Sequence, residues 1–235
     1  MYSFRSRVRY SEVGEDKKLT LYGILNYFQD CSTFQSEMLG VGLARMEQIR
    51  KVWVLNAWQI VVERYPELCE EIEIFTWPTE FSGFLGGRNF QMNTADGEIL
   101  AYANTLWTFL DTETMRPSRV PEDISGAYEL EEKLDMEYAP RKIPVPKDMM
   151  VHPAFVVQQS HLDTNHHVNN AQYVSIAKDY LPEGFVIGQM RAEYKMSAVL
   201  GDTVCPQVKT EDDVCTVALC NESGKIYATV EFKQK

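Results

Sequence analysis

The 235-residue sequence has few cysteines and no long apolar run. Its five cysteines are an odd number and contain no C-x-x-C pair, which excludes an obvious disulfide framework and favours reduced, structural thiols. No uncharged apolar stretch approaches the length of a membrane-spanning helix, and the first ten residues, MYSFRSRVRY, contain no secretory signal. We therefore expect a cytoplasmic protein.

Basic residues are also scarce: 23 Lys and Arg face 34 Asp and Glu, for a net charge of -11. Such a chain repels nucleic acid and anionic membranes at long range, so we expect neither as a partner. An acidic partner would need a local basic patch. Two clusters are candidates, one on an N-terminal strand and one further along the chain: Arg5, Arg7 and Arg9, then Arg141, Lys142 and Lys147. The alternative interpretation, favoured for each cluster taken alone, is ordinary solvated charge.

Common nucleotide and serine-hydrolase motifs are missing, because the chain has no P-loop, no G-x-G-x-x-G and no G-x-S-x-G elbow. What it does contain is a weak internal repeat. A shift of 149 residues lays 8–14 on 157–163 and places two helix-like segments over each other. A later match of 96–103 on 223–230 needs a shift of 127, so the second copy is shorter.

Each copy has the same order of expected elements. In the first copy, a strand near 3–10 precedes a helix from Thr20, a plausible N-cap, to Gly40, and four strand-like segments follow, at 52–64, 71–77, 84–92 and 98–110. In the second copy, a strand begins at 155, a helix runs from Asn170 to about Leu181, and further strands lie at 189–196, 202–210, 213–220 and 225–233. The pattern predicts an α+β protein made of two tandem units, each with a long helix packed in a curled antiparallel β-sheet.

Six of the ten prolines lie in residues 117–153, which predicts an extended linker between the units. The resulting boundaries are an N-terminal domain at 1–125, a Pro-rich linker at 126–152 and a C-terminal domain at 153–235 that carries the candidate site.

The candidate site is the stretch HLDTNHHVNN, residues 161–170, which holds three of the four histidines. Under the shift of 149, Asp163, Asn165 and His167 fall on Gly14, Asp16 and Lys18, so the first copy lacks the set. The loop delivers a carboxylate, an amide and an imidazole to the N-terminus of the next helix, where unpaired N–H groups favour a negative oxygen. These groups fit the activation of water against a carbonyl carbon.

Two other interpretations remain open. Asp163 and Asn165 can simply close an Asx turn, with Asn169 or Asn170 as a helix cap. Alternatively, His161, His166 and His167 can bind a metal ion, although adjacent histidines point apart and no partner cluster occurs elsewhere. We expect no metal and no cofactor.

The stretch from Leu162 to Tyr173, L-D-T-N-H-H-V-N-N-A-Q-Y, resembles the D-x-N-x-H-V-N-N-x-x-Y signature of acyl-acyl carrier protein thioesterases of plants and bacteria. Further similar motifs occur in order along nearly the whole chain: W-V-L at Trp53, R-Y-P at 64–66, I-F-T-W at 74–77, G-E-I-L at 97–100 and D-T-E-T-M-R-P-S-R-V-P-E at 111–122.

This resemblance implies a tandem hotdog fold and a hydrolase of fatty acid biosynthesis. The enzyme would release free fatty acid from the thioester on acyl carrier protein, its partner. It also implies Asp163, Asn165 and His167 as the catalytic residues. From their chemistry we infer that Asp163 acts as general base or nucleophile, that Asn165 and His167 position water and the carboxylate, and that helix N–H groups hold the oxyanion. A homodimer is a further expectation. Alternatives from other classes are an acyl-CoA thioesterase and a non-catalytic acyl-binding module.

One departure from the family pattern concerns the strand after the candidate loop. Members commonly place a Glu three residues after its Tyr, and the plant enzymes place a Cys next. Here Tyr194 is followed by Ser197 and Ala198 at those positions, so a cysteine nucleophile is not expected. The change favours a slower enzyme, a water held by Ser197, or binding without cleavage. Glu193 lies on the same strand but about 13 Å away, too far to substitute.

Overall fold

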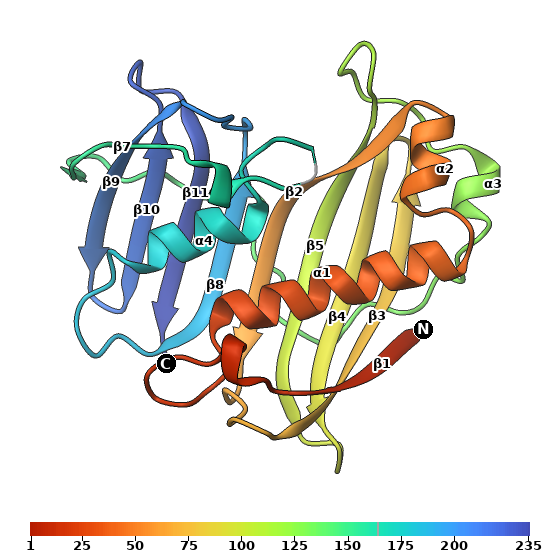
Figure 1. The fold of residues 1–235 in the computed structure, drawn as a ribbon, viewed down its shortest axis with the longest axis horizontal. Helices are drawn as coiled ribbons and strands as arrows, with labels where there is room; N and C mark the ends of the chain where they lie inside the picture. Colours follow the sequence, from red (N-terminus) through yellow and green to blue (C-terminus); the bar gives the residue numbers. More distant parts are fainter. Residues whose placement is uncertain (164) are drawn as a thin grey trace. The chain divides into compact units, whose positions relative to one another are not determined.

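The computed structural model describes residues 1–163 and 165–235 of the chain. Its contacts define two units: unit 1 contains residues 1–56 and 62–138, and unit 2 contains residues 57–61 and 139–235. In each unit a helix runs across an antiparallel sheet (Figure 1). The predicted α+β class is thereby confirmed. No helix in the described part of the chain combines the length and apolar character needed to cross a membrane.

The sheet of unit 1 has the order β1-β3-β4-β5-β2. As the sequence predicts, apolar residues alternate along its strands or are buried in a continuous run. The strand bounds are β1 Tyr2–Arg7, β2 Lys51–Val62, β3 Glu71–Ser82, β4 Leu85–Thr94 and β5 Ile99–Asp111. Helix α1, Leu21–Met38, lies against this sheet because Ile24, Phe28 and Cys31 on one helix face are completely buried. Thr20 caps it by accepting a hydrogen bond from the N–H of Gly23, at 3.1 Å, as predicted.

Two short helices of unit 1 were not predicted. Helix α2, Leu43–Gln48, and helix α3, Glu122–Ser125, are too short for a 3.6-residue period to show in the sequence. They bury Met46 and Ile124 in one apolar cluster with Phe109 of β5. Both were missed because long-range packing, rather than local pattern, stabilises them.

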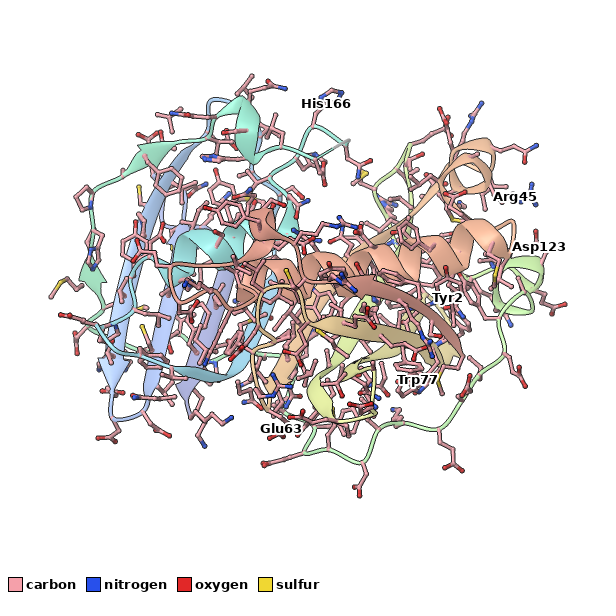
Figure 2. All side chains as sticks on the ribbon, turned by 60° about the horizontal axis from the view of Figure 1, so that its bottom comes forward. Tyr2, Arg45, Glu63, Trp77, Asp123 and His166 are labelled. Carbon is pink, nitrogen blue, oxygen red and sulfur yellow. The ribbon has the colours of Figure 1, made fainter. Side chains whose placement is uncertain are left out.

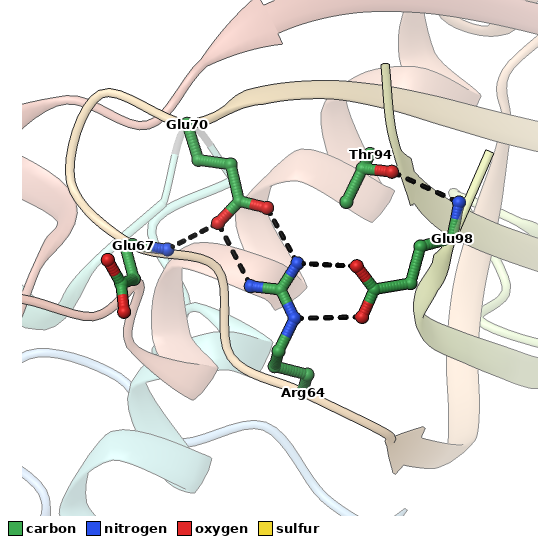
Figure 3. A network of polar contacts seen from close by, with 5 residues as sticks. All are labelled: Arg64, Glu67, Glu70, Thr94 and Glu98. Carbon is green, nitrogen blue, oxygen red and sulfur yellow. Dashed lines mark hydrogen bonds and ion pairs between the residues drawn. The ribbon is translucent and has the colours of Figure 1, made fainter. Parts of the chain in front are cut away.

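An arginine clamp joins the hairpin ends of unit 1 (Figure 3). Arg64 donates to both carboxylate oxygens of Glu70, at 3.0 and 2.7 Å, and to both of Glu98, at 2.9 and 2.8 Å. Glu70 and Glu98 belong to the links that precede β3 and β5, so one guanidinium fork connects two turns.

Unit 2 is built from residues 57–61 of β2 and the strands β8 Ile187–Tyr194, β11 Ile226–Gln234, β10 Val214–Cys220, β9 Thr203–Glu211 and β6 Met150–Val151, in that spatial order. The two-residue β7, Phe155–Val156, also pairs with β9. Helix α4, Asn170–Lys178, ends earlier than predicted. The strand at 155 is also shorter than predicted, because the chain turns into a 3-10 helix at Gln159–His161.

The internal repeat is visible in the hydrogen bonds. Residues Tyr10–Glu12 form a 3-10 helix in unit 1, and the second 3-10 helix begins 149 residues later. Thr20 N–H donates to Glu12 O at 3.0 Å, and Asn169 N–H donates to His161 O at 2.9 Å, again with a shift of 149. The same backbone scaffold therefore precedes the central helix in both units.

Most of the linker lacks regular secondary structure but is tied to the units it follows and precedes. In unit 1, Trp77 donates its indole N–H to Glu132 O at 2.8 Å. In unit 2, Ile143 is 1% exposed and donates its N–H to the carboxylate of Glu193 at 3.2 Å. The predicted domain boundaries at 125 and 153 stay a prediction.

Candidate active site

The candidate residues lie on a tight turn of unit 2, between the 3-10 helix and α4. Asp163 N–H donates to His167 O at 2.8 Å, and His166 N–H returns to Asp163 O at 3.1 Å. His166 adopts a φ of 60°, which closes the turn. The structure therefore places Asp163, Asn165 and His167 within one turn. Thr164, the second residue of the D-x-N motif, lies outside the described residues.

Asp163 organises this turn with one carboxylate oxygen. Its Oδ1 accepts from the N–H of Asn165 at 2.8 Å and from the N–H of His167 at 3.3 Å, as in an Asx turn. The other oxygen, Oδ2, has no hydrogen-bond partner among the described residues. The side chain is half-buried, so one oxygen builds the loop while the second remains available to a ligand or water.

The equivalent turn of unit 1 has the same backbone without this set of side chains. Gly14 N–H donates to Lys18 O at 2.9 Å, and Lys17 N–H donates to Gly14 O at 3.0 Å. Lys17 has a φ of 62°, matching His166. There the side-chain bond to the turn comes from Asp16, whose Oδ1 accepts from Lys18 N–H at 3.1 Å. The turn therefore requires neither an aspartate at the position of Asp163 nor a histidine at that of His167.

The other polar side chains of the loop differ in exposure. Asn165 and His166 are exposed, and Figure 2 shows His166 at the periphery of the molecule with its ring directed outward. His167 is half-buried, and its backbone forms a bridge with Val199. His161 instead receives a hydrogen bond from Gln158 N–H at Nδ1 and packs its ring against Phe155.

No group of three or more His, Cys, Asp or Glu side chains within 1–163 and 165–235 is arranged to hold a metal ion. Because His161 uses Nδ1 locally and His166 points outward, the structure does not bring the three loop histidines together as ligands.

The N-terminus of α4 follows the turn directly. Asn169 caps it by accepting from Ala171 N–H at 2.8 Å, and its carbonyl accepts from Gln172 N–H at 2.9 Å. The N–H of Asn170 has no partner among the described residues, and it carries the positive end of the helix dipole. This is the type of donor that stabilises an oxyanion.

Residues 197–199 lie directly beside the candidate turn. Val168 N–H donates to Ala198 O at 2.9 Å, and the adjoining His167 and Val199 form the bridge described above. Ala198 is completely buried, whereas Ser197 is exposed. The two positions at which the family commonly has Glu and Cys are therefore held next to the loop, and the local chemistry there is that of a single serine hydroxyl.

Two tyrosines, the buried Tyr173 and the half-buried Tyr194, connect these segments and were not predicted as site residues. Tyr173 of α4 accepts the Ala198 N–H at its hydroxyl, at 2.8 Å, and Tyr194 of β8 donates its hydroxyl to Asn170 O at 2.9 Å. Burial raises the pKa of Tyr173 to about 12 and that of Tyr194 further, so both stay protonated at neutral pH. In the sequence, Tyr173 could have been recognised as a tyrosine inside an otherwise apolar helix face.

Glu193, the acid directly before Tyr194 on β8, has other partners. It is 6% exposed, accepts from Ile143 N–H at 3.2 Å and pairs with Lys195 Nζ at 3.5 Å. Its strand neighbour Tyr194 faces α4, so Glu193 points to the opposite face of the sheet.

The arginine cluster at the N-terminus is not a free basic surface. Arg5, Arg7 and Arg9 line a hollow of unit 1 but pair with Glu73, Glu71 and Glu12, respectively. These glutamates largely cancel the positive charge that the strand alone suggested.

Comparisons with known proteins agree with this architecture. The family model for the acyl-ACP thioesterase N-terminal domain matches residues 1–128, and the model for the C-terminal domain matches residues 146–234. The chain belongs to the acyl-ACP thioesterase family. These thioesterases include relatives that are named as acyl carrier protein hydrolases. The resemblance noted in the sequence is thus confirmed over almost all of the chain.

Plant enzymes are among the curated relatives. The chain is 25% identical over 213 residues to a chloroplastic palmitoyl-acyl carrier protein thioesterase of Gossypium hirsutum, covering 83% of this chain and 51% of the relative. It is 26% identical over 203 residues to a chloroplastic oleoyl-acyl carrier protein thioesterase of Arabidopsis thaliana, covering 79% and 56%. The chain spans about half the length of these relatives.

Solved structures share the complete fold. An acyl-ACP thioesterase from Bacteroides thetaiotaomicron superposes with a TM-score of 0.90 at 19% identity, covering 99% of this chain and 97% of the other. The 12:0-ACP thioesterase from Umbellularia californica gives 0.85 at 22% identity, with coverage of 99% and 97%. The predicted tandem hotdog fold is confirmed by these likenesses.

Proposed function

We propose that the chain hydrolyses the thioester between a fatty acyl chain and acyl carrier protein and releases a free fatty acid. The observation that carries this proposal is the comparison of the two turns. Gly14 and Lys18 form the same backbone turn as Asp163 and His167, so the turn requires neither a carboxylate at its first position nor an imidazole at its last. An aspartate and a histidine at these two positions, beside a helix N-terminus, are best explained by chemistry.

In the proposed reaction, Asp163 acts through its unpartnered Oδ2 as general base toward water or as nucleophile. Asn165 and His167 position the water and the carboxylate, and the Asn170 N–H binds the oxyanion. Attack of water on the carbonyl carbon breaks the C–S bond directly, whereas attack of Asp163 breaks it with formation of an acyl-aspartyl anhydride, which water then hydrolyses. The carrier's thiol leaves with a proton, and the acyl group leaves as a carboxylic acid.

Substitution of Asp163 by Asn tests this role without removing the turn. The amide oxygen retains an acceptor for Asn165 N–H, whereas the negative charge is lost. We expect kcat/KM for acyl-acyl carrier protein to fall about a hundredfold or more. The matched control is Asp16→Asn, which alters the equivalent turn of unit 1 and leaves turnover unchanged. Full activity of Asp163→Asn would refute the assignment.

Two alternative functions predict different results in thioesterase assays. An acyl-CoA thioesterase would show a higher kcat/KM on the coenzyme A thioester than on the carrier thioester of the same acyl chain. A non-catalytic acyl-binding module, which the Ser197 and Ala198 replacements favour, would bind acyl thioesters and release no fatty acid. Assays with both thioesters of one chain length separate all three.

The proposed enzyme acts on acyl carrier protein in fatty acid biosynthesis. We expect it to work in the cytoplasm and to form a homodimer.

Acyl carrier protein is acidic, so productive docking requires a positive surface on this chain. With the N-terminal arginines paired, the remaining cluster is Arg141, Lys142 and Lys147, all exposed or nearly so. Size-exclusion chromatography with light scattering tests the dimer.

A further inference from the structure

Cys205 and Cys220 lie directly opposite each other on neighbouring strands of unit 2. Cys205 belongs to β9, Cys220 is the last residue of β10, and the two are partners in the antiparallel register. Side chains of directly opposed residues emerge on the same face of a sheet, so their Cβ atoms are close. Both residues are free cysteines. The sheet of unit 2 therefore holds a pair of thiols side by side.

The spacing of this pair fits a disulfide bond. Directly opposed residues of an antiparallel sheet have Cα atoms about 4.5–5.5 Å apart, within the span of about 4.4–6.8 Å found in disulfides. To form the bond, the two Cβ atoms must approach each other by about 1 Å. The strand end permits such a shift, because β10 stops at Cys220 and its register with β11 is already irregular between Leu219 and Cys220.

Within residues 1–163 and 165–235, no other cysteine stands opposite a second cysteine on a neighbouring strand. Cys215 of β10 faces Thr210 on β9 and Phe232 on β11. It is separated from Cys220 by an odd number of residues, so it points to the other face of the sheet. The paired arrangement is therefore specific to Cys205 and Cys220.

The two thiols differ in exposure, which sets the order in which they react. Cys205 is half-buried, whereas Cys220 is 3% exposed. Burial raises the pKa of Cys220, and the nearby Cys205 raises it further. Lys195 acts in the opposite direction, so its ammonium favours the Cys220 thiolate when that group reacts. A reagent from solvent therefore reaches Cys205 first, and Cys220 completes the bond.

We propose that Cys205 and Cys220 are a modification site at which a small disulfide, such as oxidised glutathione, forms a reversible cross-strand disulfide. The Cys205 thiolate attacks one sulfur of the oxidant, forms a mixed disulfide and releases one thiolate. Cys220 gives its proton to water, attacks the Cys205 sulfur and releases the second thiolate, and the released thiolates take up protons. The chain is oxidised by two electrons, and the oxidant is reduced to two thiols.

Cys205 is connected to the candidate active site through Asp202, three residues earlier in the chain. One oxygen of Asp202, Oδ2, accepts from Val199 N–H at 3.0 Å and from the hydroxyl of Tyr227 at 3.3 Å. Val199 in turn forms the backbone bridge with His167. A shift of Cys205 toward β10 therefore displaces the acceptor that holds Val199 beside the candidate turn.

The disulfide form should accordingly hydrolyse acyl thioesters about tenfold more slowly than the dithiol form, because displacements near 1 Å around catalytic groups reduce rates by this much or more. This loss of rate rests on the proposed function. Formation of the bond rests on the register and exposure of the two cysteines alone.

Oxidised glutathione added to the reduced, intact chain tests bond formation. Tryptic digestion should yield peptide 196–209 cross-linked to peptide 210–225, and dithiothreitol should separate the two. Cys220→Ala should abolish the cross-link. The matched control is Cys215→Ala, which changes the same peptide on the other face of the sheet and should keep the cross-link. Absence of the cross-link in wild type, or its persistence in Cys220→Ala, would overturn the proposal.

Two further measurements test the connection to the candidate site. Oxidation should lower kcat of wild type about tenfold and reversibly, whereas Cys220→Ala should keep its rate in the same oxidant. Hydrogen exchange at the Val199 amide, a readout without catalysis, should be faster in the disulfide form. An unchanged rate in active wild type, or unchanged exchange at Val199, would overturn the connection. A chain that forms the cross-link with faster exchange but hydrolyses no thioester would refute the hydrolase proposal alone.

Discussion

Tyr173 and Ala198 are joined by a hydrogen bond of 2.8 Å from the backbone N–H of Ala198 to the tyrosine hydroxyl. The carbonyl of Ala198 accepts from Val168 N–H at 2.9 Å. Ala198 is therefore held at both backbone groups, by α4 on one side and by the candidate loop on the other. A tyrosine that touches neither Asp163 nor His167 through a hydrogen bond thus positions the segment against which their loop rests.

Substitution of Tyr173 by Phe should destabilise unit 2 by about 1–3 kcal/mol, because the buried Ala198 N–H loses its acceptor. The free energy of unfolding from urea titration measures this effect. Tyr10→Phe serves as the control, since Tyr10 is 83% exposed. Equal unfolding free energies for Tyr173→Phe and wild type would show that the hydrogen bond contributes nothing.

The arginine clamp predicts a pH-dependent stability. The hydrogen bond from Arg64 is the main cause of the lowered pKa of Glu70, and the same partner lowers the pKa of Glu98. A carboxyl whose folded pKa lies below its unfolded value, 4.5, stabilises the fold fully above that value. This stabilisation is lost as the pH falls through the folded pKa.

We therefore expect Arg64→Met to be less stable than wild type at pH 7 and to lose less stability on acidification. Solvent screening of the partly exposed pair limits the Glu70 contribution to about 1 kcal/mol. Urea titrations at pH 7 and pH 3 measure the difference, with Arg119→Met as control. A constant gap between Arg64→Met and wild type at both pH values would contradict the linkage.

At a matched pair of backbone positions, gaining a glycine and losing one should have opposite effects on stability. Cys69 has a φ of 71°, and Gly201 occupies the equivalent place in unit 2 with a φ of 86°. Each N–H donates to the residue directly after a strand, Cys69 to Val8 O at 3.0 Å after β1 and Gly201 to Val157 O at 3.1 Å after β7. A residue with a Cβ is strained at such φ values.

Cys69→Gly should accordingly stabilise the protein by about 1 kcal/mol, and Gly201→Ala should destabilise it by about the same amount. Thermal and urea unfolding of both variants check the pair. Destabilisation by Cys69→Gly would mean that the cysteine side chain contributes more than the strain costs.

The serine beside the candidate loop predicts a gain of activity. Ser197 is exposed and adjoins Ala198, so a longer acidic side chain fits without repacking. If hydrolysis is limited by the missing carboxylate, Ser197→Glu should raise kcat/KM about tenfold or more. Ser197→Gln has the same shape without the charge and should not. Equal rates for the two variants would exclude a role for the carboxylate.

Local patterns predicted most of the secondary structure. Thr20 was recognisable as an N-cap, and the alternation of apolar residues marked the long strands β2 to β5. The shift of 149 residues between the repeats reappears in backbone hydrogen bonds such as Thr20 to Glu12 and Asn169 to His161. These features depend on neighbours within a few residues, and the sequence contains that information.

The short length of β7 and the presence of α2 and α3 could not be predicted. The strand expected from residue 155 ends at Val156, because pairing with β9 stops where the 3-10 helix begins. Neither the pairing of Arg5 with Glu73 nor that of Arg64 with Glu98 is visible in a local pattern, since the partners are 68 and 34 residues apart. Ion pairs of this kind therefore become visible only in the tertiary structure.

The sequence by itself determined the two tandem units, the family, and the candidate set of Asp163, Asn165 and His167 on one short turn, because turn and helix signals act over a few residues. Only the tertiary structure brought the Ala198 N–H to the hydroxyl of Tyr173 and the Arg64 guanidinium to the carboxylate of Glu98. Such contacts depend on which side chains the sheets and helices bring together, and on how completely they exclude water.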